Sequence, residues 1–160
     1  QLASYVQSRS YRAPEVLLGL PYDQKIDLWS LGCIVAELWT GYVLFQNDSV
    51  QSLLARIIGI LGPVPQHILN QGRHVPQYFS VDGRLYREEE PDPSTSPSGR
   101  RYMLFLPKRS SLKQRMRTHD VEFIDFLSSL LQVDPAGRPT ASQALRHPWL
   151  APGRYSDGLT

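Results

Sequence analysis

The chain has 160 residues, of which 41% are hydrophobic and 20% are charged, and this is the composition of one ordinary globular domain. The formal net charge of +2 does not imply a nucleic-acid or membrane partner, and no apolar run approaches the ~18 residues that a membrane-spanning helix needs. Cys33 is the single cysteine, which excludes an intrachain disulfide and favours a reducing compartment. Because the chain also begins at Gln1 rather than at a methionine, we expect an internal piece of a cytoplasmic or nuclear protein.

The N-terminal part is predicted to be a loop followed by a buried helix. Residues 1–23 are polar and contain turn-forming prolines and a glycine. The helix is predicted from about Gln24 to Trp39, with Asp23 as a candidate N-cap and Gly41 beyond its end. Its apolar residues fall on every side, and a helix that is apolar all round must be buried on all sides. We therefore expect this helix to be a central element of the fold.

A second, amphipathic helix is predicted after a short connection. Asp48 is its candidate N-cap, and Gln51, three residues later, resembles the second half of a capping box. The apolar residues from Val50 to Leu61 keep the spacing of a helix with one buried face. Gly62-Pro63 then ends it.

Two further helices are predicted near the C-terminus. Asp120 and Glu122 suit the first turn of a helix because carboxylates interact favourably with the helix dipole there. A short last helix is predicted from Thr140 towards His147, with Gln143 completing a capping box.

The long stretch between these helix pairs, residues 63–118, is predicted to be irregular. It contains Glu88-Glu89-Glu90 and then a Pro- and Ser-rich run, 91–99, with too few apolar groups to order itself. A loop of this length is most often an insertion or a docking surface. No convincing strand pattern is present, so the predicted fold class is mainly α.

Four separated motifs carry a resemblance to a known family. In chain order they are Ser8-Arg9-Ser10-Tyr11-Arg12-Ala13-Pro14-Glu15, Asp27-Leu28-Trp29-Ser30-Leu31-Gly32, Gly41-Tyr42-Val43-Leu44-Phe45 and Asp134-Pro135-Ala136-Gly137-Arg138-Pro139. In this order and spacing they resemble the C-terminal lobe of eukaryotic protein kinases, with its substrate-binding loop and the family's helices αF to αI. The resemblance implies a partial kinase domain over residues 1–150 and a tail over 151–160, with the N-lobe and catalytic loop absent and residues 63–118 as the αG–αH insertion.

The subfamily is narrowed by the first motif and its surroundings. Arg9-x-Tyr11-Arg12 and the long insertion resemble the CMGC kinases. Ser4-Tyr5-Val6-Gln7-Ser8, together with 17–23, is most similar to the dual-specificity tyrosine-regulated (DYRK) and Yak kinases. The chain departs from the Tyr-x-Tyr pair of that family because Ala3 stands in the first position, and Ala3 also argues against a MAP-kinase Thr-x-Tyr switch.

The resemblance implies roles for the residues of the substrate-binding loop. Tyr5 matches a tyrosine that is phosphorylated, and a phosphate brings about −1.5 to −2 charge that arginine side chains can bind. Arg9 and Arg12 match the arginines that receive it, and Tyr11 belongs to the same loop. Ser8 matches a hydroxyl that positions catalytic groups, which makes it a positioning residue rather than a nucleophile.

Three further positions are implied to be structural. Glu15 and Arg138 resemble a buried ion pair that ties the substrate-binding loop to the end of the domain. Asp27 resembles the aspartate that holds the backbone of the catalytic loop, with Trp29 at the offset that the family shows. The alternative for Asp27 is a helix-start carboxylate that the dipole favours.

Two groups of residues fall outside the kinase motifs. The histidines at 67, 74, 119 and 147 lack the close spacing of a zinc site, so no metal site is expected. The insertion carries a basic cluster that could bind an acidic protein or a nucleic acid. The favoured alternative is a polar loop that is only solvated. Its members are Arg100, Arg101, Lys108, Arg109, Lys113, Arg115 and Arg117.

The chemistry of a kinase depends on residues that the chain does not contain. The glycine-rich loop, the strand lysine, the catalytic aspartate and the magnesium-binding aspartate would all precede Gln1. The resemblance therefore implies a parent serine/threonine or dual-specificity kinase that uses ATP and Mg²⁺ on protein substrates, with no nucleic-acid or membrane partner. The chain alone is expected to hold no catalytic residue, to bind no ATP, to be inactive and to expose apolar surface. A pseudokinase or a non-catalytic docking module is the alternative.

Overall fold

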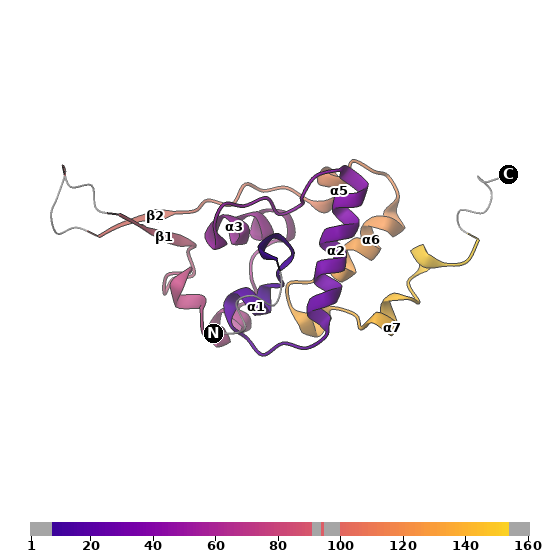
Figure 1. Ribbon diagram of the computed structural model, residues 1–160, viewed down its shortest axis with the longest axis horizontal. Coiled ribbons are helices and arrows are strands. Elements are labelled where there is room, and N and C mark those ends of the chain that lie inside the picture. Colours follow the sequence, from indigo (N-terminus) through magenta and orange to yellow (C-terminus); the bar gives the residue numbers. More distant parts are fainter. Residues whose placement is uncertain (1–7, 91–93, 95–99, 154–160) are drawn as a thin grey trace.

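The computed structural model describes residues 8–90, 94 and 100–153, and over these residues the fold is mainly helical. The helices are α1 (Pro14–Leu18), α2 (Lys25–Thr40), α3 (Val50–Leu61), α4 (Gln66–Gln71), α5 (Leu112–Met116), α6 (Val121–Leu130) and α7 (Ala141–Ala144). The two strands are β1 (Tyr86–Glu89) and β2 (Arg101–Leu104). Figure 1 shows α2 and α6 side by side, α1 and α3 on one flank of α2, and the hairpin β1–β2 projecting away from the helices. None of the helices in the described part is long and apolar enough to cross a membrane.

Helix α2 is the central element, but it is covered on fewer sides than its sequence predicts. Trp29, Cys33 and Ala36 are buried in the main core, and burial raises the pKa of the Cys33 thiol to about 12. The opposite side carries an exposed apolar stripe of Leu31, Ile34 and Leu38, the last of which is 80% exposed. The burial on all sides that the sequence pattern requires is not reached, because no described element covers that stripe, and the expectation that the chain alone exposes apolar surface is confirmed.

Close contact between α2 and α6 depends on a glycine. A Cβ atom at Gly32 would lie 2.8 Å from Leu131 Cδ2, so any side chain there would separate the two helices or displace Leu131. At its C-terminal end α2 stops at Gly41, which has the left-handed φ of 79° and whose N–H donates to Glu37 O. The predicted end of the helix is confirmed.

The N-terminus of α3 lies one residue further on than the capping prediction. Ser49, not Asp48, is the N-cap, because its Oγ accepts a hydrogen bond from Ser52 N at 3.1 Å. Ser52, not Gln51, closes the capping box, since its Oγ accepts from Ser49 N at 3.0 Å. Serine can supply both bonds because its hydroxyl is donor and acceptor at once.

The C-terminal helices have the predicted caps. Asp120 is the N-cap of α6 and accepts from Phe123 N at 3.0 Å. Thr140 and Gln143 form the predicted capping box of α7, which ends at Ala144, before His147.

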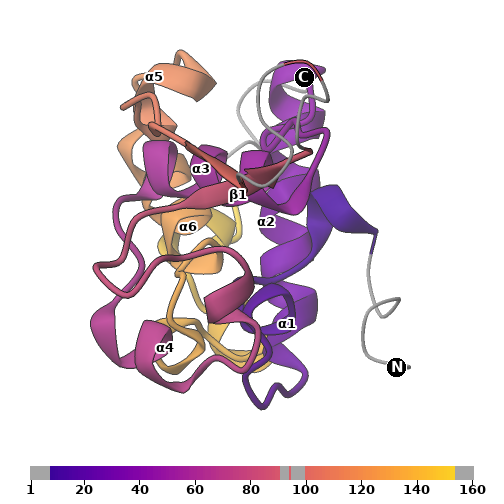
Figure 2. The ribbon, with the colours of Figure 1, turned by 90° about the vertical axis from the view of Figure 1, so that its left-hand side faces the viewer.

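The segment 63–118 is more regular than predicted, since it contains α4, both strands and α5. The strands pair antiparallel with Tyr86 opposite Leu104 and Glu89 opposite Arg101, so the prediction of no strand is wrong. Each strand has only four residues; β1 is mostly partly buried and β2 is exposed throughout, so neither strand alternates between buried apolar and exposed polar residues. Figure 2, viewed towards the hairpin, places β1 in front of α3 and α6.

The irregular segment after the hairpin contacts α3 at one glycine. Ser110 N donates to Gly59 O at 2.8 Å, and a Cβ at Gly59 would lie only 2.4 Å from Lys108 O. The segment 108–110 therefore rests directly on the backbone of α3.

We predict that Gly59→Ala destabilises the protein although alanine is the better helix former by about 1 kcal/mol. The added methyl forces the 108–110 segment off α3, and overpacking of this kind costs about 1–3 kcal/mol. Urea unfolding measures the change, with Gln51→Ala in the same helix as a control that should stay within about 0.5 kcal/mol. A gain in stability for Gly59→Ala would contradict the contact.

Candidate functional site

The substrate-binding loop predicted at residues 8–15 is an ordered turn followed by the short helix α1. Arg9–Tyr11 forms a 3-10 turn, and Pro14 occupies the first position of α1, where its missing N–H costs nothing. Helix α1 ends at Gly19, whose φ is 74°. The loop thus leaves Ser8 and Arg9 exposed, while Glu15 is buried.

Hydrogen bonds to α2 hold the middle of this loop. Tyr11 Oη donates to Glu37 Oε2 at 2.5 Å, and Ser30 Oγ donates to Tyr11 O at 2.8 Å. The hydrogen bond to the Glu37 carboxylate, with some burial, raises the pKa of Tyr11 above its ordinary value. Asn47 Nδ2 donates to Ser10 Oγ at 3.1 Å, so the chain after α2 also contacts the loop.

Glu37, Ser30 and Asn47 were not predicted as site residues. Glu37 has one usable signal in the sequence, because it is the only charged residue in the second half of an otherwise apolar helix. Such a residue usually has a specific partner. Nothing in the sequence pairs it with Tyr11.

Arg12 is partly buried and lies near Tyr78. Burial raises the pKa of Tyr78, and the nearby Arg12 guanidinium acts in the opposite direction. Tyr5, the predicted phosphorylation site, lies outside the described residues, so its relation to Arg9 and Arg12 stays a prediction.

The structure brings Glu15 and Arg138 together in a buried, bidentate ion pair. Arg138 Nη1 lies 2.6 Å from Glu15 Oε1 and Nη2 lies 3.0 Å from Oε2, and both residues are 1% exposed. The remaining N–H groups donate to Gln132 O, twice, and to Lys25 O. All five N–H donors of the guanidinium therefore have an acceptor.

The same guanidinium lies over an aromatic ring of α2. Its Cζ is 5.4 Å from the centroid of Trp29, and Trp29 stacks on Phe45 with ring centroids 5.6 Å apart. Lys25 Nζ donates to Pro135 O at 3.1 Å beside it. One side chain thus joins the end of the loop 8–15, the start of α2 and the 132–138 segment.

Asp27 lies in the first turn of α2 with an exposed side chain. Over the described ranges it forms no ion pair. Both alternatives, a helix-start carboxylate and an anchor for a further segment, are compatible with this position.

The described part of the chain contains no group of three or more His, Cys, Asp or Glu residues suited to a metal ion. Two of the four histidines instead pair with separate carboxylates. His67 pairs with Asp134 at 2.8 Å and His147 with Asp125 at 2.7 Å.

These features define a protein kinase domain, and the comparison with known families agrees. The chain belongs to the protein kinase domain family, whose sequence model matches residues 1–150. Among curated relatives it is similar to kinases of the DYRK family, which confirms the resemblance drawn from its motifs.

Three of these relatives illustrate the similarity. The chain is 39% identical over 151 residues to the human dual specificity tyrosine-phosphorylation-regulated kinase 4, covering 94% of this chain and 27% of the relative. It is 40% identical over 156 residues to the Drosophila melanogaster dual specificity tyrosine-phosphorylation-regulated kinase 2, covering 98% and 20%. It is 40% identical over 147 residues to the Schizosaccharomyces pombe DYRK-family kinase pom1, covering 92% and 13%. The chain therefore spans at most 27% of the length of these three relatives.

We predict that Arg138→Met destabilises the protein by about 3–5 kcal/mol, because Glu15 is then left charged, buried and unpaired. Methionine keeps most of the side-chain length, so the loss measures the ion pair together with the hydrogen bonds to Gln132 O and Lys25 O rather than a large cavity. Thermal unfolding measures the effect.

Arg146→Met is the matched control, since Arg146 is exposed and the charge change is the same. It should stay within about 0.5 kcal/mol of the unchanged protein. Equal melting temperatures for the two variants would show that the pair does not hold the fold.

Proposed function

We propose that residues 1–150 form the C-terminal lobe of a protein kinase domain, from the activation loop to the last helices, with residues 151–160 as a tail. The parent protein transfers the γ-phosphate of ATP, with Mg²⁺, to serine and threonine hydroxyls of protein substrates, and to tyrosine in its own activation loop. The observation that carries this proposal is the ordered loop 8–15, held by Glu15–Arg138 at one end and by Tyr11–Glu37 in the middle. A peptide-binding platform needs such fixed backbone.

The role of the loop follows from charge and position. Arg9 is exposed and Arg12 is partly buried, and both belong to the segment that follows Tyr5. A phosphate on Tyr5 offers oxygens that arginine side chains bind through bidentate hydrogen bonds. Arg9 and Arg12 would bind a phosphate on Tyr5, and Ser8 would position the catalytic groups supplied by another part of the domain.

The exposed stripe of α2 supports a domain larger than this chain. Leu31, Ile34 and Leu38 follow the i, i+3, i+7 spacing of one helix face, and exposed apolar area of this kind usually meets another element. Asp27 lies on the same helix with an exposed side chain and would accept hydrogen bonds from the backbone of the catalytic loop. We propose that the kinase segments upstream of the activation loop cover this face.

A pseudokinase is the second candidate, since the residues for phosphoryl transfer are not in the chain. It would keep the same ion pair and the same helix α2. The intact set Tyr5, Ser8, Arg9 and Arg12 favours the active kinase, because a scaffold has no need for a working substrate loop.

Phosphoryl transfer to a generic protein substrate tests the proposal. The full-length protein should transfer labelled phosphate from Mg-ATP to serine or threonine, and mass spectrometry should find phosphate on Tyr5. Residues 1–160 alone should transfer none. Tyr5→Phe should lower the rate of phosphoryl transfer about tenfold, because the loss of one charge-assisted hydrogen bond of roughly 1.5 kcal/mol corresponds to that factor.

Tyr22→Phe is the control for that variant, since Tyr22 is an exposed tyrosine outside the loop. Its rate should be unchanged. A full-length protein that binds no ATP and transfers no phosphate would favour the pseudokinase, whereas activity in residues 1–160 alone would contradict the division of roles.

We predict that the double variant Leu31→Gln and Leu38→Gln makes residues 1–160 more soluble and reduces binding of an apolar dye. The same variant should destabilise the full-length protein by about 2–5 kcal/mol, since two side chains that are buried there would become polar. Solubility, dye fluorescence and melting temperature measure the three effects.

Val121→Gln and Leu145→Gln form the matched control, because both residues are exposed and lie off the stripe. They should leave the full-length protein unchanged. A stripe variant that is equally harmless in the full-length protein would mean that nothing covers this face of α2.

A further inference from the structure

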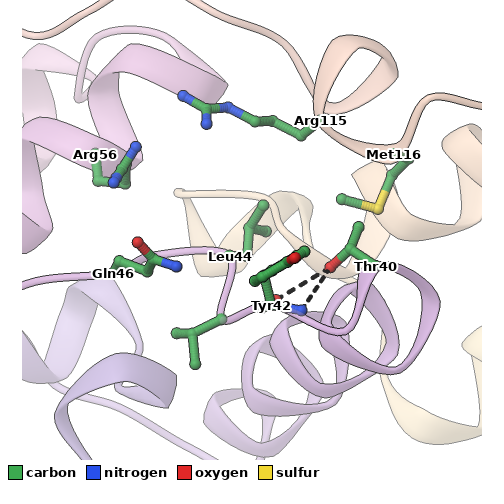
Figure 3. Close-up of a pocket in the computed structure, with 8 residues that line it drawn as sticks. Thr40, Tyr42, Leu44, Gln46, Arg56, Arg115 and Met116 are labelled. Atoms are coloured by element: carbon green, nitrogen blue, oxygen red, sulfur yellow. Dashed lines mark hydrogen bonds between the residues drawn. The ribbon is translucent and has the colours of Figure 1, made fainter.

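A strongly basic groove lies where α2, α3 and α5 meet. One cavity of about 290 Å³ has walls that include Thr40 at the end of α2, Tyr42 and Leu44 after it, Arg56 of α3, and Arg115 and Met116 of α5 (Figure 3). A second cavity of about 680 Å³ shares Thr40, Tyr42, Arg115 and Met116 with it and adds further cations. We call the joint depression the basic groove, and its cations are Arg56, Lys108, Arg109, Arg115 and Arg117.

Within the described part of the chain, no acidic side chain compensates the charges of the groove. No acidic residue lines either cavity, and across residues 8–90, 94 and 100–153 none of the five cations forms an ion pair with a carboxylate. Residues 100–117 contain seven basic residues and no acidic one. Uncompensated charge in a concave surface concentrates the electrostatic field and attracts a ligand of opposite sign.

The groove is a fixed part of the fold rather than a loose loop. Trp39 Nε1 donates to Met116 O at 3.0 Å, which attaches α5 to the end of α2. Ser110 N donates to Gly59 O at 2.8 Å, and Arg115 Nε donates to Ser110 Oγ at 2.9 Å. The guanidinium of Arg115 therefore keeps its place while its outer N–H groups remain available.

The floor of the groove is apolar and has room for a side chain. Leu44 and Met116 are buried beneath it, and Tyr42, 71% exposed, stands at its edge. The hydroxyl of Thr40 holds the Tyr42 backbone, since Thr40 Oγ1 donates to Tyr42 O and accepts from Tyr42 N, both at 3.1 Å (Figure 3). A ligand that fits has anionic groups on both sides of one apolar group.

We propose that the basic groove is a docking site for an acidic peptide segment of a partner protein. Carboxylate or phosphate groups of the segment bind Arg56, Lys108, Arg109, Arg115 and Arg117, and one apolar side chain of the segment lies against Tyr42, Leu44 and Met116. A nucleic acid is disfavoured because the cations converge on a pocket of side-chain size instead of following a strip along which a phosphate backbone could run. The inference goes beyond phosphoryl transfer, since docking can be measured without it.

Fluorescence anisotropy with the full-length protein tests the proposal. The probe is a fluorescein-labelled peptide in which Asp and Glu flank a central leucine. One matched probe carries phosphoserine in place of the acids, and a second carries Asn and Gln. A labelled single-stranded oligonucleotide of similar charge is the fourth probe.

We expect the acidic or the phosphorylated peptide to bind and the uncharged peptide not to bind. The tighter of the two anionic peptides identifies carboxylate or phosphate as the preferred group. Lys108→Glu combined with Arg109→Glu should weaken binding about tenfold, because reversed charges at an interface repel the ligand. Arg56→Gln, on a different element, should weaken it about threefold, roughly one ion pair. Added salt should weaken it as well.

Arg101→Glu combined with Lys113→Glu is the matched control, since it reverses two charges of the same cluster that line neither cavity. It should change the affinity less than about twofold. Equal weakening by both double variants, or no binding of either anionic peptide, would overturn the proposal. An oligonucleotide that binds more tightly and displaces the peptide would also overturn it, in favour of a nucleic-acid interface.

Discussion

The fold depends on one buried cation, the guanidinium of Arg138. Its five N–H groups reach Glu15, Gln132 O and Lys25 O, and its face covers Trp29. A buried ion pair is often no more stabilising than apolar side chains of the same volume, because both charges lose their hydration. What it adds here is geometry, since five directed bonds are satisfied in only one arrangement of the loop 8–15, the start of α2 and the 132–138 segment.

Contacts along helix α2 connect the Arg138 region to the rest of the structure. Near its start, Lys25 and Trp29 contact the Arg138 region, and in its second half Glu37 accepts a hydrogen bond from Tyr11 of the loop 8–15. At its end, Trp39 Nε1 binds Met116 O and so positions α5 and the basic groove. The loop and the groove therefore lie on one rigid element, and the distance between them is set by a helix rather than by a flexible connection.

The sequence predicts the parts of the fold that local chemistry decides. The boundary at Gly41, the capping box of Thr140 and the mainly helical class follow from side chains that act within one helical turn. The hairpin β1–β2 and helix α1 do not follow, because four-residue strands without an alternating apolar pattern and a five-residue helix carry no periodic signal. The pairing of Glu15 with Arg138 joins residues 123 positions apart, so only the family resemblance could suggest it. The apolar pattern of α2 predicts that the helix needs partners on every side, but it does not identify which face stays exposed in this chain, since that depends on the elements that pack against it.

The basic cluster illustrates the same limit of sequence-based prediction, here for function. In the sequence its seven members are one polar run, with solvent as the simplest partner. In the fold, the single turn of α5 and the left-handed φ of 51° at Arg117 bring four of them into one groove, where Arg56 of α3 joins them. Five like charges in one groove repel one another, and the contacts of Ser110 and Met116 hold them there against that repulsion. An anionic segment would relieve the repulsion and gain the field of all five cations, whereas an ordinary solvated loop would be free to spread them apart.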